Sequence, residues 1–250
     1  MTDTQSAADR WPLPPDVIEL NDDGVHVWQV STAANESEDE QLAVLLSADE
    51  RQRAKQFRFA KDRRLYTAAH AAMRSLLACY LGVPGDAIHL DSGAHGKPSI
   101  ARPAGSRLQF NLSHSHELAL LAVTRGKAVG VDIELVKNFA FQEVAQRFFT
   151  AKEVAELSAL PQALHREAFY KCWTSKEGFL KAKGTGLSGH LDEVQILSTA
   201  EGAVKIAANV PGWSLVELTP AGGYAAALVI EGDPLPVHCY RWQYRLSGNS

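Results

Sequence analysis

The fold is decided by residues 150–184, TAKEVAELSALPQALHREAFYKCWTSKEGFLKAKG. The opening TAKE places Thr and Glu three residues apart, which is the capping-box pattern that begins a helix. A long helical stretch then ends at Gly184, and glycine is the residue that commonly closes a helix. The same plan occurs 103 residues earlier, because SADE at 47–50 is a second capping box and RRLYTAAHAAMRSLLACYLG at 63–82 is a second long helix.

The repeat extends to the strand patterns that precede the helices. VHVWQV at 25–30 opens the first half, and VGVDIEL at 129–135 opens the second. Any α+β chain shows some self-similarity, and a tandem duplication of one α/β unit also explains the shared order of elements. On the duplication hypothesis the halves are roughly 1–126 and 127–250, and the cleft between them is the expected ligand site.

Composition narrows the class of protein. The chain has 250 residues, of which 46% are hydrophobic and 22% charged, as in ordinary globular proteins. Its net charge of −4 argues against a broadly basic nucleic-acid binder. The three cysteines lack CxxC spacing, which suits a reducing compartment. Because the chain shows neither a signal peptide nor an apolar run of about 18 residues, we expect a cytoplasmic protein without a membrane partner.

Two carboxylates lie on one face of a predicted strand. In a strand, residues two apart point the same way, so Asp132 and Glu134 of GVDIE share a face. Two such carboxylates repel each other unless a cation or a proton lies between them. Oxygen ligands suit Mg²⁺ or another hard cation. The alternative interpretation is a solvent-facing strand that carries two charges.

A third carboxylate stands among lysines on the second long helix. In W-x-x-KE-x-x-x-K at 173–181, Glu177 and Lys181 are four residues apart and can form a simple surface ion pair. The neighbouring Lys176 adds positive charge beside the same carboxylate. Such a helix can instead hold a metal ligand next to ammonium groups that bind anions.

Two turns carry further polar groups. FNLSHSH at 110–116 places Ser113 and His114 at a strand end, where a hydroxyl and an imidazole can bind phosphate. A hydrolase would need an elbow of the G-x-S-x-G type, which is absent, and a zinc site would need more local ligands. GKP at 96–98 presents Lys97 on a rigid turn, or is an ordinary solvated turn.

The offset of 103 suggests that the site is asymmetric. It pairs each carboxylate with a residue that is not an acid: Gln29 opposite Asp132, Ser31 opposite Glu134 and Arg74 opposite Glu177. If the duplication is real, one metal site exists per chain. The first half would then contribute other groups across the cleft.

Together these clusters resemble the 4'-phosphopantetheinyl transferases of the larger, surfactin-synthetase-activating (Sfp) type. The matching motifs are GKP at 96–98, FNLSHS at 110–115, GVDIE at 130–134, W-x-x-KE-x-x-x-K at 173–181 and KGTGLS at 183–188. The resemblance extends from about residue 47 to 230. Each motif alone is weak, but their order and spacing together are specific.

The resemblance implies a fold and a reaction. The fold would be α+β, with two similar α/β lobes related by a pseudo-twofold axis and the active site between them. The lobes would span 21–126 and 127–234, with an N-terminal arm at 1–20 and a C-terminal tail at 235–250. The enzyme would move the phosphopantetheine arm of coenzyme A to a serine of an apo acyl or peptidyl carrier protein, using Mg²⁺ or Mn²⁺. Adenosine 3',5'-bisphosphate would leave, and the protein would act as a monomer.

The resemblance also implies roles for individual residues. The metal carboxylates would be Asp132, Glu134 and Glu177; coenzyme A would contact Arg53, Lys97, Ser113, His114, Lys176 and Lys181. Lys176 and Lys181 would lie beside the diphosphate, and Glu177 would take the serine proton directly or through a metal-bound water. Glu50 departs from the family pattern, since related proteins can carry a lysine there. A non-catalytic module that binds coenzyme A or a carrier protein is the alternative, although pure binding does not require three clustered acids.

Overall fold

The computed structural model describes residues 11–31, 36–93, 95–186, 191, 194–200, 204–208 and 210–244. Parts of the expected N-terminal arm, of the KGTGLS motif (from 187) and of the C-terminal tail (from 245) lie outside these residues. Within the described part, no helix combines the length and the apolar character needed to cross a membrane.

Apart from one short 3-10 turn, the described parts of the two halves contain the same kinds of elements in the same order. The first half contains β1 (Val25–Ser31), α1 (Glu36–Val44), α2 (Ala48–Lys55), α3 (Ala60–Leu81), the short 3-10 turn η2 (Gly85–Ala87), β2 (His89–Ser92), β3 (Pro98–Arg102), β4 (Leu108–Ser115) and β5 (Leu118–Arg125). The second contains β6 (Val129–Leu135), α4 (Phe141–Phe148), α5 (Ala151–Ala159), α6 (Gln162–Lys183), β7 (Ile196–Ala200), β8 (Val204–Ala208), β9 (Trp213–Leu218) and β10 (Tyr224–Glu231), and β11 (Val237–Arg241) follows it.

The sheets repeat the same topology. The first sheet has the order β11-β1-β5-β4 and the second β6-β10-β9, so β1, β5 and β4 match β6, β10 and β9. Neighbouring strands are antiparallel, except that β1 and β11 are parallel. The predicted α+β fold with two similar α/β lobes is therefore confirmed. The tail strand β11 was not predicted, since its sequence carries no signal we could interpret.

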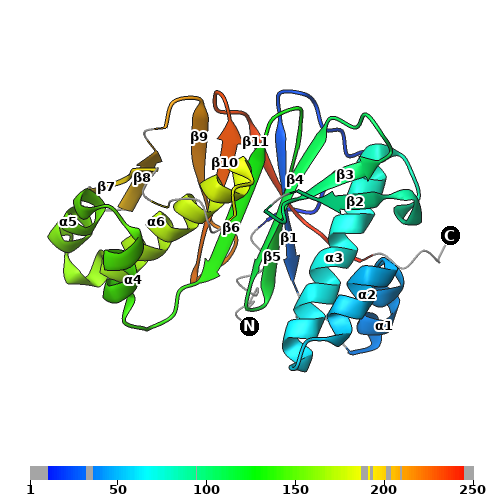
Figure 1. Ribbon diagram of the computed structural model, residues 1–250, viewed down its shortest axis with the longest axis horizontal. Helices are drawn as coiled ribbons and strands as arrows, with labels where there is room; N and C mark the ends of the chain where they lie inside the picture. Colours follow the sequence, from blue (N-terminus) through cyan, green and yellow to red (C-terminus); the bar gives the residue numbers. More distant parts are fainter. Residues whose placement is uncertain are drawn as a thin grey trace, which may run out of the picture.

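The molecule has four layers, with α3 and α6 on the outside and the two sheets between them (Figure 1). Alternate side chains of β1 and β6 face inward, where Val27, Val131 and Ile133 join a core shared by both sheets. Trp28 faces the opposite way and packs with residues of α3. The strand period therefore decides which residues of β6 are left to face α6.

Local signals explain where the short helices α2 and α5 begin and where the long helices α3 and α6 end. Both capping boxes form: the Ser47 hydroxyl accepts a hydrogen bond from the Glu50 amide, and Thr150 accepts one from Glu153. Both long helices have 22 residues and end at a glycine in the left-handed conformation, Gly82 after α3 and Gly184 after α6.

Candidate active site

The two halves meet where β4 and β6 lie side by side, joined by side chains instead of a backbone ladder. Asn111 accepts a hydrogen bond from the Val131 amide at 2.8 Å, and Ser113 donates to Asp132 at 2.8 Å. Further along, the Ser115 hydroxyl donates to Glu134 at 2.8 Å. These β4 residues alternate along the strand and therefore share one face. Asn111 and Ser115 were not predicted as site residues, although the alternation in FNLSHS carries that signal.

Two glycines bring α6 unusually close to β6. A Cβ on Gly130 would lie 2.0 Å from the Gly178 carbonyl oxygen and 2.4 Å from the Ala182 nitrogen. Only a residue without a side chain fits there. The close approach places the α6 residues Glu177 and Lys181 over the acidic face of β6 that carries Asp132.

The resulting cluster couples acids to one lysine. Asp132 Oδ1 accepts hydrogen bonds from Ser113 and from Lys181 Nζ, the latter at 2.5 Å. Lys181 Nζ also donates to Ser113 Oγ at 2.8 Å. Asp132 and Glu177 are buried, while Glu134 is partly exposed. The fold thus gathers all three predicted carboxylates and Lys181 at the junction of the lobes.

The charges of this cluster are not fully balanced. Burial, together with the neighbouring Asp132 carboxylate, raises the pKa of Glu177 to about 7, although Lys181 opposes the shift. Burial and Asp132 also raise the pKa of Glu134. The Asp132 carboxylate thus disfavours ionisation of both Glu134 and Glu177, which is the situation that a bound cation relieves.

The donor set fits a hard metal ion. Asp132 Oδ2 and Glu177 Oε1 are buried and have no hydrogen-bond partner in the described part of the chain. Unpaired buried carboxylate oxygens are costly without a cation or a donor. Across the described residues, no group of three or more His, Cys, Asp or Glu side chains is arranged to hold a metal ion as it stands. Asp132 Oδ1 and Glu134 Oε2 are already hydrogen-bonded, to Ser113 and Lys181 and to Ser115 respectively.

A cavity of about 1190 Å³ lies in the first lobe, and all its lining residues fall between 44 and 114. Arg53 and His114, both predicted to contact coenzyme A, are part of its lining. The neighbouring residue Ser113 instead faces the carboxylates, because successive residues of β4 point to opposite faces. The adjacent positions 113 and 114 therefore connect the cavity to the acidic cluster.

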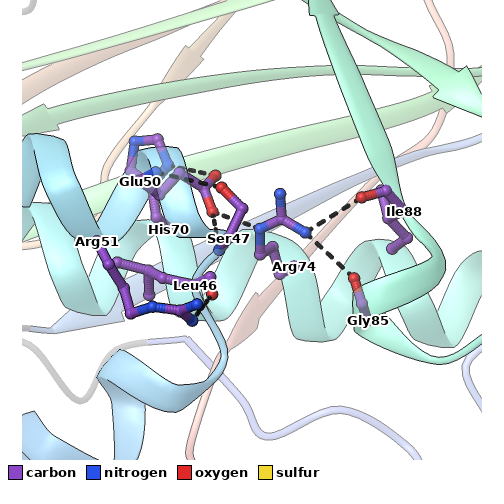
Figure 2. A network of polar contacts seen from close by, with 8 residues as sticks. All are labelled: Leu46, Ser47, Glu50, Arg51, His70, Arg74, Gly85 and Ile88. Carbon is purple, nitrogen blue, oxygen red and sulfur yellow. Dashed lines mark hydrogen bonds and ion pairs between the residues drawn. The ribbon is translucent and has the colours of Figure 1, made fainter.

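Figure 2 shows the network that frames this cavity. Glu50 pairs with Arg74 and with His70, whose Nδ1 lies 3.0 Å from Glu50 Oε1. Arg74 also donates to the carbonyl oxygens of Gly85 and Ile88, in the segment that follows α3 (Figure 2). Its partners lower the pKa of Glu50 to about 2 despite the opposing effect of burial. Glu50 therefore remains an anion, paired with Arg74 and hydrogen-bonded to His70, and it does not take the place of a basic nucleotide contact.

The second lobe contains a similar network, but there the paired charges, Lys176 and Glu153, are buried. The helices α3 and α6 begin at residues 60 and 162, 102 residues apart, so Arg74 stands opposite Lys176. Lys176 pairs with Glu153 at 2.8 Å, and its Nζ donates to the carbonyl oxygens of two residues after α6, Leu191 and Val194. In this lobe the Ile196 amide donates directly to Glu153 Oε1 at 2.7 Å. In the second lobe the glutamate is therefore bound by the backbone amide of Ile196 in β7, whereas in the first lobe it is bound by the His70 side chain.

Two sequence predictions are corrected here. The offset of 103 wrongly placed Arg74 opposite Glu177, because α5 is one residue longer than α2 while the loop before α6 is two residues shorter than the loop before α3. Lys176 does not lie beside the carboxylates of the junction: it is fully buried and bound to Glu153. The helical period explains this, since adjacent residues 176 and 177 point about 100° apart.

Lys97 is also placed differently from the prediction. Its Nζ donates to the carbonyl oxygens of Val129, at 3.0 Å, and Ala182, at 2.9 Å. The flanking Gly96 and Pro98 line the cavity, but Lys97 is not among the lining residues. The ammonium group therefore faces the second lobe.

The duplicated α/β plan, with an acidic cluster at the junction of the lobes, is matched by family comparisons. Residues 128–229 match the 4'-phosphopantetheinyl transferase superfamily, and residues 30–126 match the 4'-phosphopantetheinyl transferase N-terminal family. The chain belongs to the 4'-phosphopantetheinyl transferases. It is an enzyme that activates carrier proteins and uses coenzyme A as its co-substrate.

Relatives of the chain cover much of its length. The 4'-phosphopantetheinyl transferase HetI of Nostoc sp. is 39% identical over 223 residues, which are 88% of this chain and 93% of the relative. The 4'-phosphopantetheinyl transferase Sfp of Bacillus subtilis is 28% identical over 172 residues, 69% of this chain and 75% of the relative. The human L-aminoadipate-semialdehyde dehydrogenase-phosphopantetheinyl transferase is 31% identical over 161 residues, 60% of this chain and 52% of the relative.

Proposed function

We propose that the transfer depends on Mg²⁺ held by Asp132, Glu134 and Glu177 and releases adenosine 3',5'-bisphosphate. The observation that carries this proposal is a pair of buried oxygens, Asp132 Oδ2 and Glu177 Oε1, that have no hydrogen-bond partner among the described residues and lie near the Lys181 ammonium. Mn²⁺ has similar ligand preferences and would substitute. When bound, the ion would withdraw charge from the diphosphate of coenzyme A.

Individual residues of the chain would have separate roles in binding coenzyme A and in the transfer. Arg53 and His114 would bind the nucleotide end of coenzyme A in the first-lobe cavity, which both residues line. Ser113 would orient Asp132, to which it donates a hydrogen bond. Lys181 would neutralise charge that develops on the transferred phosphoryl group. Glu177 would accept the proton of the attacking carrier serine.

Further features of the enzyme belong to the same proposal. We assign it to the surfactin-synthetase-activating type, on the motif set and on the matched N-terminal family. The lobes would extend over 21–126 and 127–234, flanked by an arm at 1–20 and a tail at 235–250. The enzyme would act as a cytoplasmic monomer without nucleic-acid or membrane partners.

The test is a transfer assay on a panel of apo carrier domains. With coenzyme A and Mg²⁺, each accepted carrier gains the mass of the phosphopantetheine group, and EDTA abolishes the gain. Asp132→Asn should lower kcat by at least about 100-fold while coenzyme A still binds, because it removes charge without changing shape. Asp233→Asn is the matched control, since Asp233 is exposed and lies far along the chain. Full activity of Asp132→Asn, or full activity in EDTA, would refute the proposed metal site.

A further inference from the structure

Two turns from opposite lobes meet at the C-terminal end of α6. A Cβ on Gly184 would lie 3.3 Å from Lys97 Cδ, and a Cβ on Gly186 would lie 3.3 Å from His95 Cβ. Both glycines have φ values in the left-handed region, 70° and 65°. The β2–β3 turn of the first lobe therefore packs directly on the backbone that closes α6.

The Lys97 ammonium holds this contact in place. It donates to the Ala182 carbonyl oxygen at 2.9 Å, in the last turn of α6, and to the Val129 carbonyl oxygen at 3.0 Å, at the start of β6. The last carbonyl groups of a helix lack partners within the helix, and a positive charge there is favourable. Burial lowers the pKa of Lys97, so the two carbonyl bonds offset a real cost of desolvation.

The same turn forms part of the cavity wall. Gly96 and Pro98, on either side of Lys97, both line the cavity of about 1190 Å³ in the first lobe. A ligand that fills this cavity therefore contacts the backbone from which the Lys97 side chain extends. The side chain itself leaves the cavity and crosses to the second lobe.

The other end of this connection is the acidic cluster. Lys181 immediately precedes Ala182 on α6, and its Nζ donates to Asp132 and to Ser113. Glu177 lies one turn earlier on the same helix. A small displacement of the end of α6 would therefore move Lys181 and Glu177 relative to Asp132.

We infer that Lys97 is a positioning residue that couples occupancy of the first-lobe cavity to the placement of α6, and that it does not bind the 3'-phosphate of coenzyme A. This inference rests on the proposed function of the carboxylates and Lys181. It assigns the GKP and KGTG motifs a joint role, because the first supplies the ammonium that binds the Ala182 carbonyl group and the second supplies Gly184, which leaves room for the Lys97 side chain.

Dephospho-coenzyme A lacks the 3'-phosphate, so it distinguishes two roles of Lys97. In the first, Lys97 is a clamp that holds the end of α6 through its carbonyl groups; in the second, Lys97 binds the 3'-phosphate. If Lys97 is a clamp, Lys97→Met lowers kcat by about 10- to 100-fold with either co-substrate, as expected for a small misplacement of reacting groups. The Kd for coenzyme A, measured by calorimetry, then changes by less than about 3-fold, under 0.7 kcal/mol. Lys152→Met removes an exposed lysine of α5 and is the matched control, with kcat and Kd unchanged.

The opposite results would overturn the inference. A phosphate ligand predicts that Lys97→Met raises the Kd for coenzyme A at least about 10-fold and leaves the Kd for dephospho-coenzyme A unchanged. Unchanged kcat with both co-substrates would equally exclude the coupling.

Hydrogen exchange separates this inference from the proposed function. Peptides that cover residues 177–186 should exchange faster in Lys97→Met than in wild type, since the last turn of α6 loses its ammonium partner. In wild type, coenzyme A should slow the same exchange, and in Lys97→Met this effect of coenzyme A should be lost. Exchange that is identical in the two proteins refutes the clamp. Failure of wild type to modify any carrier refutes the proposed function and leaves the exchange result valid.

Discussion

The close contact between α6 and β6 at Gly130 predicts that Gly130→Ala is damaging for a steric reason alone. The added Cβ would lie 2.0 Å from the Gly178 carbonyl oxygen and 2.9 Å from Ala182 Cα, whereas ordinary contacts begin at about 3.4 Å. Backbone atoms cannot rotate away as a side chain can. The helix α6 must therefore withdraw from β6 by roughly 1 Å or more.

This displacement should reduce both stability and activity. Overpacking of this kind lowers the free energy of unfolding by about 1–3 kcal/mol, which corresponds to a Tm about 2–12 °C lower for a chain of this size. The withdrawal also moves Glu177 and Lys181 away from Asp132, so kcat should fall by about 100-fold. Thermal unfolding followed by circular dichroism and transfer kinetics at 20 °C measure the two effects.

Two other glycines serve as controls for this prediction. A Cβ on Gly178 meets the Val229 methyl group Cγ2 at 3.3 Å, and the helical preference for alanine offsets this contact by about 1 kcal/mol. Gly178→Ala should therefore keep its stability within about 1 kcal/mol of wild type. Gly24→Ala, whose Cβ would meet its nearest atom at 4.0 Å, should change nothing. A Gly130→Ala enzyme with the Tm and kcat of wild type would refute this account of how α6 is placed.

Three further predictions concern a buried ion pair, a histidine and an arginine. Lys176→Met should lower the free energy of unfolding, measured in urea, by about 3–5 kcal/mol, because it leaves the Glu153 carboxylate without its cation. The double variant with Glu153→Gln should recover stability, and a loss below about 1 kcal/mol in Lys176→Met would contradict the prediction. Burial, and to a lesser extent the neighbouring His238, lowers the pKa of His26 from 6.5 to about 4. Between pH 6.5 and pH 4 the unfolded chain therefore binds more protons than the folded chain, so the free energy of unfolding decreases as the pH falls through this range. His26→Gln should flatten that fall, and an unchanged pH profile would count against the assignment. Arg53→Ala should raise the Kd for coenzyme A about 10-fold in calorimetry; an unchanged Kd would remove Arg53 from the cavity site.

Short-range patterns in the sequence predicted much of the fold. The capping boxes at Ser47 and Thr150 fix the starts of two helices through contacts within four residues. Strand alternation in 129–135 correctly placed Asp132 and Glu134 on one face. The duplicated order of elements followed from the same local signals.

The candidate site was predicted in part for the same reason. Three carboxylates and Lys181 come together because strand and helix periods determine which way each residue points. The sequence offset failed by one residue in α6, and one residue is enough to turn a side chain by about 100°. The resemblance placed Lys176 beside the diphosphate, but Lys176 points away from the carboxylates, pairs with Glu153 and is the counterpart of Arg74.

The sequence by itself determined the two-lobe plan, the acidic strand and the membership of a transferase family. Only the tertiary structure decided where the long side chains end. Lys97 and Lys176 both reach backbone carbonyl groups far along the chain, at Ala182 and Val194, and no local pattern specifies such partners. The physical reason is that a lysine stem spans several ångströms, so its ammonium binds wherever packing leaves carbonyl oxygens without donors.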